Sequence, residues 1–260
     1  MLDNYEQFKK DVYALTKIDL NCYKEKQMRR RIDTLINKNK INDYSEYVAL
    51  IKKDKEKFEQ FVNFLTINVS EFYRNPEQWK ILENEVFPKL VDKFGKNIKI
   101  WSAACSTGDE PYSLVMALSR VVPLSNIKVI ATDIDKQVIE KAKAGLYAEK
   151  SLKALPKEFV QQYFEKVNDR TYAISDAVKS RVKFQQHNLL KDDYPINCDL
   201  IVCRNVMIYF TEEAKQEIYV KFNKALKKDA VLFVGSTEQM VQPKNLGFSS
   251  VHSFFYRKES

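Results

Sequence analysis

The sequence predicts an α/β protein built on a doubly wound, mostly parallel sheet, with an all-helical domain in front of it. From Ile98 onward, short apolar runs that end at polar residues alternate with amphipathic stretches, which is the order that βαβ units require. Residues 3–65 instead show only helical spacing, with apolar side chains every three or four positions. Between Tyr163 and Ser180 the pattern weakens to short alternating pieces such as Tyr172–Ile174, which predicts a small antiparallel insertion.

These patterns define the expected domain organisation. The 260 residues, of which 45% are hydrophobic, suffice for two cores of modest size. We expect a helical N-terminal domain at 1–68, a linker with a connecting helix at 69–97, and a sheet domain at 98–260 with the insertion at about 160–184. The connecting helix should begin after Asn75-Pro76 and end at Gly95, since proline suits a helix start and glycine a helix end.

The individual elements follow from local signals. Asp43 and Glu46 form a plausible capping box for a helix that continues through Tyr47 and Leu50. The runs expected as strands of the large sheet are Ile98–Trp101, Ile127–Thr132, Val182–His187, Asp199–Cys203, Val231–Gly235 and Ser253–Arg257.

The composition narrows the possible partners. A formal net charge of +8 and a pI of about 9.1 suggest an acidic partner, whether nucleic acid, anionic membrane or an acidic protein surface. Because there is no signal-peptide pattern and no long uncharged apolar run, we expect a cytoplasmic protein that is not embedded in a membrane. The sequence leaves the oligomeric state open, and we take a monomer as the default. The four cysteines form no CxxC pair, so we expect reduced structural cysteines and no metal site.

The segment from Ile98 to Asp135 is the most informative part of the chain. A buried strand leads into a turn of small residues and then a helix near Glu110, and the next strand ends at Asp133, where a carboxylate would meet a ribose. The turn contains only Gly108 instead of GxGxxG, and the acids that follow would repel a pyrophosphate. The pattern therefore favours a cationic, phosphate-free nucleoside, which we interpret as S-adenosylmethionine (AdoMet), over NAD.

Two asparagines follow later strands. Asn205 comes directly after the apolar strand that ends at Cys203, and Asn188 ends the run VKFQQHN, so both should lie at the ligand-binding edge of the sheet. Base and glutamine N-methyltransferases usually have Asn/Asp-Pro-Pro-Tyr at the position where this chain has Asn205. Here Val206 and Met207 replace the prolines, which makes an amine-bearing base a poorer acceptor. Asn205 could also simply cap the next turn.

Two further segments lie outside the βαβ pattern. In INVSEFYR, the side chains of Asn68, Ser70 and Arg74 could close over a ligand, although the first two could instead cap a helix. In the second helix, expected at Tyr23–Asn37, five cations occur within eight residues. Lys26, Arg29 and Arg30 should project opposite the face of Met28, Ile32 and Leu35, whereas Lys24 and Arg31 should flank this apolar stripe. The five cations suggest docking on an acidic partner, as an alternative to an ordinary solvated face.

Together, these motifs resemble the CheR family, the chemotaxis receptor glutamate O-methyltransferases. The resemblance covers nearly the whole chain, from the helical N-domain through INVSEFYR, SAACSTGDEPYS, ATDID, HNLL, CRNVMIYF and GSTE. It implies a Rossmann-like AdoMet-dependent methyltransferase sheet and the conversion of glutamate side chains of methyl-accepting chemotaxis receptors to methyl esters, with S-adenosylhomocysteine as the second product. The short insertion is similar to that of members that do not use a carboxy-terminal pentapeptide tether on the receptor.

The resemblance also implies roles for individual residues. Asn68, Ser70 and Arg74 would contact AdoMet or line its site. Glu110 would take the methionine amino group and Asp133 the ribose hydroxyls. Asn188 with Leu189, and Asn205 with Val206, would frame the adenine and methionine ends. Tyr209 would sit beside the transferred methyl group, so Arg74 and Tyr209 are the candidate catalytic residues. The basic second helix resembles the one that docks on acidic receptor helices.

Two alternatives remain open at this point. A nucleic-acid methyltransferase would suit the basic pI, although the Pro-Pro-Tyr motif is missing and the cations concentrate on one N-terminal helix. A non-catalytic AdoMet-binding adaptor would have no need of Arg74 and Tyr209.

Overall fold

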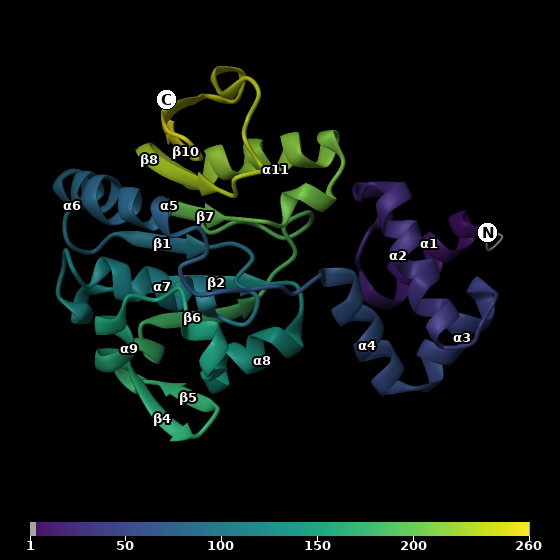
Figure 1. The fold of residues 1–260 in the computed structure, drawn as a ribbon. Coiled ribbons are helices and arrows are strands. Elements are labelled where there is room, and N and C mark those ends of the chain that lie inside the picture. Colours follow the sequence, from purple (N-terminus) through teal and green to yellow (C-terminus); the bar gives the residue numbers. More distant parts are fainter. Residues whose placement is uncertain (1–3, 260) are drawn as a thin grey trace. The chain divides into compact units, whose positions relative to one another are not determined.

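The computed structural model describes residues 4–259, so the outermost ends of the expected domains, 1–3 and 260, lie outside the described residues. The chain folds into two compact units. The helical unit contains the residues up to Asn68 together with Val206–Ile218, and the sheet unit contains Val69–Asn205 and the chain from Tyr219 onward. Figure 1 labels the main helices and strands of both units.

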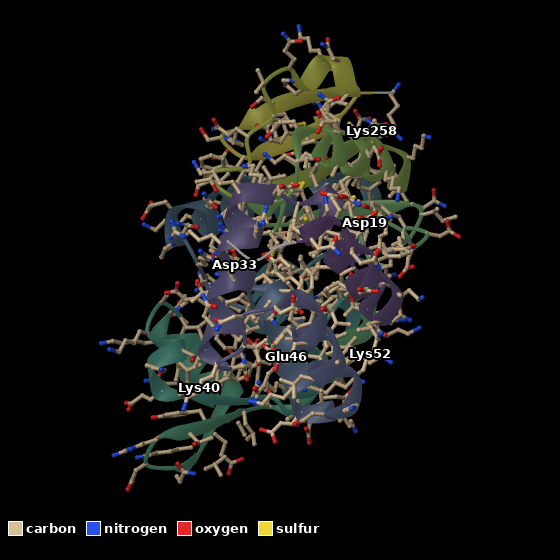
Figure 2. The ribbon with its side chains drawn as sticks, turned by 90° about the vertical axis from the view of Figure 1, so that its right-hand side faces the viewer. Asp19, Asp33, Lys40, Glu46, Lys52 and Lys258 are labelled. Carbon is tan, nitrogen blue, oxygen red and sulfur yellow. The ribbon has the colours of Figure 1, made fainter. Side chains whose placement is uncertain are left out.

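The helical unit contains the helices that the periodicity predicted. They are α1 (Tyr5–Thr16), α2 (Glu25–Lys38), α3 (Tyr44–Lys53) and α4 (Lys55–Thr66). Rings from three of them form the core: Phe8 lies 4.6 Å from Tyr44 and 6.2 Å from Phe61, centroid to centroid. The predicted cap is also present, because the Asp43 side chain accepts a hydrogen bond from the Glu46 amide at 2.9 Å. Acidic and basic side chains are interspersed over this unit (Figure 2).

One orientation predicted for α2 is wrong. Arg29 does not project into solvent opposite the apolar face: it is half-buried, and its guanidinium lies 4.9 Å from the ring centroid of Tyr5 on α1. Arg31 flanks the apolar stripe as expected and donates to the Phe64 carbonyl at 3.0 Å. Lys24, Lys26 and Arg30 are exposed. Two of the five cations therefore hold helices together, because a guanidinium can stack on a ring and donate at once.

A short segment from late in the chain packs against the start of α2. The Lys24 amide donates to the Tyr209 carbonyl at 2.9 Å, and the Thr211 amide donates to the Cys22 carbonyl at 2.9 Å. The Tyr23 and Phe210 rings meet edge to face at 4.9 Å. These bonds explain why Val206–Ile218 groups with the helical unit.

The sheet unit is built on a seven-stranded sheet with the order β6-β2-β1-β7-β8-β10-β9. Its strands are β1 (Lys99–Ser102), β2 (Lys128–Asp133), β6 (Val182–Gln186), β7 (Cys198–Cys203), β8 (Leu226–Val234), β9 (Phe248–His252) and β10 (Phe255–Lys258). The first five pair in parallel, and β10 is antiparallel to both of its neighbours. The doubly wound fold and all six predicted strands are confirmed, within a few residues at their ends, whereas β9 was not predicted.

The antiparallel insertion is confirmed as well, with one strand from further upstream. β4 (Phe164–Asn168) and β5 (Thr171–Ile174) form a hairpin, and β3 (Leu146–Ala148) completes a three-stranded sheet of order β3-β5-β4. The remaining helices are α7 (Asp109–Leu118), α8 (Lys136–Ala144), α9 (Lys157–Tyr163), α10 (Asp176–Lys179) and α11 (Glu212–Ala225).

The connecting helix runs as predicted from Pro76 to Phe94, with one irregular turn. It consists of α5 (Pro76–Ile81), a π-helical turn at Leu82–Val86 and α6 (Phe87–Phe94), and it ends at Gly95 with φ 79°. Pro88 lacks the N–H that would bond to the carbonyl four residues earlier, which accounts for the wider turn in front of it.

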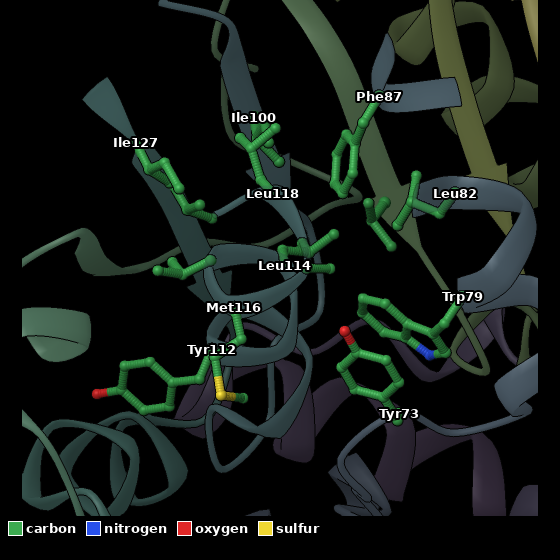
Figure 3. Packing of buried hydrophobic residues seen from close by; sticks show 14 of the residues in the cluster. Tyr73, Trp79, Leu82, Phe87, Ile100, Tyr112, Leu114, Met116, Leu118 and Ile127 are labelled. Carbon is green, nitrogen blue, oxygen red and sulfur yellow. The ribbon is translucent and has the colours of Figure 1, made fainter. Parts of the chain in front are cut away.

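The two faces of the central strands are covered by different elements. Ile100 packs with residues of the connecting helix and α7, including Leu82 and Leu114, in the main apolar cluster (Figure 3). The next residue, Trp101, points to the other face and meets Phe222 of α11 at 5.6 Å, since successive strand residues alternate between faces. The central strands are thus buried on both sides, as their continuous apolar sequences require. Of the helices within residues 4–259, none combines the length and the apolar character needed to cross a bilayer.

Asp43→Ala should lower the free energy of unfolding of the helical unit by about 1 kcal/mol, because the α3 amide that it caps loses its acceptor. Chemical denaturation followed by circular dichroism measures this. Asp43→Asn is the matched control and should behave like the wild type, since asparagine caps equally well. Equal stability of the alanine variant and the wild type would contradict the role of the cap.

Candidate functional site

The candidate site lies where the parallel strands end. β1 is central, with β2 on one side and β7 on the other, and the chain leaves β1 and β7 toward opposite parts of the sheet. This is the topological switch point at which open α/β sheets bind ligands. The polar groups that gather there come from three strand ends: Ser102, Asp133 and Arg204 with Asn205.

The turn after β1 is fixed by both neighbouring strands. The Ala103 amide donates to the Val202 carbonyl at 2.8 Å and the Cys105 amide to the Thr132 carbonyl at 2.9 Å. Gly108 closes the turn with φ 91°, and a Cβ there would lie 2.9 Å from the Cβ of Ala142. Only glycine meets both conditions without strain. The turn therefore presents a fixed backbone surface in front of α7.

Asp133 ends β2 as a buried carboxylate. Its Oδ2 accepts from the Ser106 amide at 2.9 Å and its Oδ1 from the Asp135 amide at 3.0 Å. Burial raises its pKa to about 6, although these amide bonds favour the charged form. Each oxygen keeps a lone pair, which suits the paired hydroxyl donors of a ribose.

Glu110 lies in the first turn of α7. Its Oε1 accepts from the Ser102 hydroxyl at 2.8 Å, and its Oε2 lies 3.9 Å from Nη1 of Arg204. Burial raises the pKa of Glu110, and the nearby Arg204 charge opposes this shift. A carboxylate so placed suits a cationic ligand group. It does not suit a phosphate, even at the N-terminal end of a helix.

A small cavity of about 40 Å³ collects several of these groups. Its lining residues are Val69, Ser70, Glu71, Arg74, Ala104, Ser106, Glu110, Arg204 and Asn205. Part of its wall comes from the segment 69–74. Four predicted site residues, Ser70, Arg74, Glu110 and Asn205, thus share one cavity, and Asp133 bonds to its wall through the Ser106 amide.

Other predicted site residues do not line this cavity. The Asn188 side chain accepts from the Leu190 amide at 3.0 Å and so shapes its own turn, and Leu189 is buried beside it. Their role at the adenine end stays a prediction. So do the roles of Asn68, Val206 and Tyr209, which belong to the helical unit.

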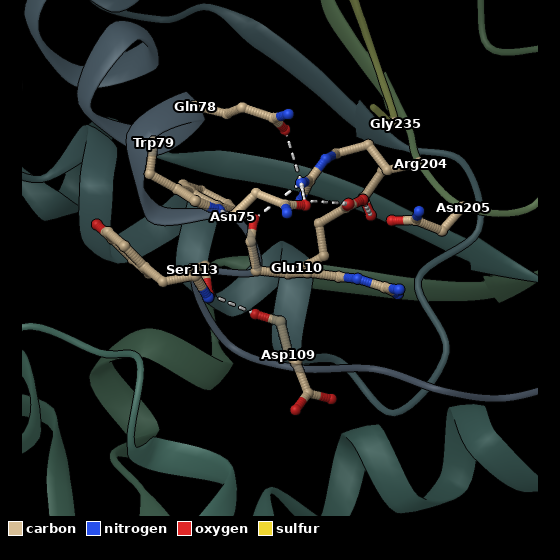
Figure 4. Close-up of polar contacts among 12 residues, drawn as sticks. Asn75, Gln78, Trp79, Asp109, Glu110, Ser113, Arg204, Asn205 and Gly235 are labelled. Carbon is tan, nitrogen blue, oxygen red and sulfur yellow. Dashed lines mark hydrogen bonds and ion pairs between the residues drawn. The ribbon is translucent and has the colours of Figure 1, made fainter. Parts of the chain in front are cut away.

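Two buried residues of the site were not assigned a role from the sequence. Arg204 binds several loop acceptors (Figure 4). Glu238 accepts from the amides of Asn205 at 2.6 Å and Gly235 at 2.9 Å through one oxygen, Oε2. Asn205 there has φ 61°, and a Cβ on Gly235 would lie 2.3 Å from that oxygen. For Arg204, the sequence did contain a signal: a charged residue directly after an apolar strand. Such a residue has to find polar partners when it is buried.

Across residues 4–259, no group of three or more His, Cys, Asp or Glu side chains could hold an ion. The donor set described above instead fits AdoMet. Glu110 can meet an ammonium and Asp133 a ribose, and the turn lacks the glycines of a pyrophosphate cradle.

The Asp133 carboxylate should make stability depend on pH. Because its pKa is raised from about 3.8 to about 6 on folding, the folded state binds this proton more tightly, and its contribution to stability falls as the pH rises between these values. Two pKa units correspond to roughly 3 kcal/mol. The free energy of unfolding of the wild type relative to Asp133→Asn should therefore fall by about this amount between pH 4 and pH 7, as denaturant titrations would show. A difference that does not vary with pH would refute it.

Known proteins match the chain along almost its whole length. The family model "CheR methyltransferase, all-alpha domain" matches residues 3–66, and "CheR methyltransferase, SAM binding domain" matches residues 68–255. A chemotaxis protein methyltransferase of Listeria monocytogenes is 39% identical over 93% of this chain and 92% of its own length. Proteins of the same name from Borreliella burgdorferi and Escherichia coli are 31% and 33% identical, over 95% and 87% of this chain and 91% and 81% of their own lengths. The chain therefore belongs to the CheR methyltransferase family and is an AdoMet-dependent methyltransferase.

Proposed function

We propose that this chain transfers the methyl group of AdoMet to glutamate side chains of chemotaxis receptors, which yields glutamyl methyl esters and S-adenosylhomocysteine. The names of the relatives support methylation in chemotaxis. The observation that carries the choice of acceptor is the match to chemotaxis methyltransferases along almost the whole chain, in both the all-alpha and the SAM-binding domain.

A glutamate acceptor is already a nucleophile at neutral pH. With a pKa near 4.3, its side chain is ionised in a ratio of roughly 500 to 1. Bound AdoMet supplies an electrophilic methyl group on a sulfonium. The protein then has to align one carboxylate oxygen with that methyl group and exclude water, and good alignment is worth about 7–11 kcal/mol.

The residues of the site divide this work. Glu110 would bind the methionine ammonium and Asp133 the ribose, so the cofactor would be held beside the ends of β1 and β2. Arg74 has one nitrogen, Nη1, 3.4 Å from the Val69 carbonyl and lies on the cavity wall. In this proposal Arg74 orients one oxygen of the acceptor carboxylate, or the cofactor carboxylate, and leaves the attacking oxygen free. A bidentate clamp on the acceptor would stabilise the ground state and slow the reaction.

The acceptor's surroundings should be acidic. Lys24, Lys26 and Arg30 are exposed on α2 and its N-cap, and the net charge of the chain is +8. These cations support docking on acidic receptor helices, with a strong dependence on ionic strength. Each methyl ester removes one negative charge, which would change the packing of a charged helical receptor bundle.

The function is tested by incubating the chain with methyl-labelled AdoMet and receptor cytoplasmic fragments, with Glu→Gln and Glu→Ala receptor variants alongside. Base-labile label that disappears with these variants is the expected result, because glutamyl methyl esters hydrolyse in base. Label that enters RNA or DNA would favour the nucleic-acid alternative. AdoMet binding by calorimetry, with no transfer to any acceptor, would favour the adaptor.

Arg74→Ala should lower kcat for receptor methylation by about ten- to a hundred-fold, the effect of losing one charge-assisted contact in the transition state. Steady-state kinetics would be compared with Lys80→Ala, a control in which an exposed lysine paired only with Glu77 is removed. A raised KM at unchanged kcat would limit Arg74 to ground-state binding.

A further inference from the structure

Arg204 ties the segment in front of α5 to the sheet edge. It follows β7 directly and is 7% exposed. Its Nη2 lies within hydrogen-bond distance of three acceptors: the Arg74 carbonyl at 2.8 Å, the Asn75 side-chain oxygen at 3.0 Å and the Gln78 side-chain oxygen at 2.8 Å. The cavity wall with Ser70 and Arg74 therefore ends at a point that is bonded to Arg204 (Figure 4).

The other end of the guanidinium faces Glu110. Nη1 lies 3.9 Å from Oε2 of Glu110, and the guanidinium carbon lies 4.7 Å from the centroid of the Phe233 ring. The ring limits where the guanidinium can move. Arg204 thus reaches the loop and Glu110 at once, which a planar group with donors on both sides can do and a single ammonium cannot.

The charges around Glu110 come from every neighbouring element. Arg204 after β7 and Arg74 in the loop favour its ionised form, as does the hydroxyl of Ser102 on β1, whereas Glu238 after β8 opposes it. Of these groups Arg204 contributes most. Burial alone would drive Glu110 toward the neutral form, and a neutral Glu110 attracts a cation poorly.

Stability alone gives little reason to keep this arrangement. Apolar residues of similar volume often replace a buried ion pair without loss, because two charges lose their hydration. A buried arginine that faces two loop acceptors, one acceptor in α5 and a carboxylate at a ligand-binding edge is therefore better explained by what it does to those partners.

We propose that Arg204 is a positioning residue for cofactor binding: it holds the loop that carries Ser70 and Arg74 and keeps Glu110 oriented and charged for the methionine ammonium. The proposal concerns the cofactor step alone, so it does not depend on the identity of the methyl acceptor.

The test uses the full chain with AdoMet as the probe, by calorimetry between pH 6 and pH 8. Arg204→Gln and Arg204→Met remove the charge, and Arg204→Lys keeps it. Arg181→Gln is the control. Arg181 lies just before β6, at the end of the sheet opposite the ligand-binding edge, and it donates to the Ala177 and Ser125 carbonyls. The Kd of each variant is divided by the wild-type Kd at the same pH. This division removes the effects of protonation of AdoMet and of Asp133, because both effects are common to the variant and the wild type.

The neutral variants should bind AdoMet at least tenfold more weakly than the wild type. The ratio of variant Kd to wild-type Kd should grow as the pH falls, because without the Arg204 charge Glu110 takes up its proton at a higher pH than in the wild type. Arg204→Lys should lose affinity by about the same factor at every pH, since the charge is restored and the loop contacts are not. Amide hydrogen exchange at residues 70–75 should be faster in all three variants.

A loss that does not vary with pH in the neutral variants would overturn the electrostatic part. Wild-type affinity in a folded neutral variant would overturn the whole proposal. Should the neutral variants fail to fold, Arg204→Lys decides: wild-type hydrogen exchange at residues 70–75 would show that Arg204 does not hold the loop.

Discussion

The parallel pairing of β1 with β2 on one side and β7 on the other is the constraint on which the site depends. Parallel strands end at the same edge, so the residues that follow them meet even when they are far apart in sequence. Ser102 and Asp133 are 31 positions apart, and Arg204 lies about 70 positions further on, yet all three reach one small region. The buried apolar strands fix this edge, and the turns that leave it carry the chemistry.

The same constraint concentrates buried charge. Asp133 and Glu110 are both pushed toward their neutral forms by burial, and each is partly compensated by nearby donors. Glu238 adds a further carboxylate, and Arg204 supplies the buried positive charge near it. A cationic cofactor would complete this balance. In the proposed site, these acids would favour a ligand that brings positive charge without phosphate.

Sequence reasoning succeeded where a local pattern has one structural solution. Apolar runs that end at Asp133 and Asn205 placed two strand ends correctly, and the signal of Asp43 with Glu46 placed a helix start. It failed for Arg29, because helical spacing gives an angle on the helix and cannot show that a ring of α1 lies beside it. Arg204 and Glu238 received no role for a similar reason. The hydrogen-bond acceptors of Arg204 lie 126 to 130 positions away in the sequence. Glu238 accepts from the Asn205 amide, which lies 33 positions away, so only the folded chain reveals these partners.

The segment after Asn205 links cofactor chemistry to the helical unit through the backbone. At Val206, three residues beyond the end of β7, the chain joins that unit, where the Tyr209 carbonyl accepts from the Lys24 amide just before α2. Backbone bonds of this kind do not depend on which side chains α2 carries. The bond between Lys24 and Tyr209 therefore fixes the position of the Tyr209 backbone relative to α2 whatever side chains α2 presents. If Tyr209 acts at the transferred methyl group and α2 docks on the partner, as proposed, the docking helix would also fix the backbone of a residue of the reaction.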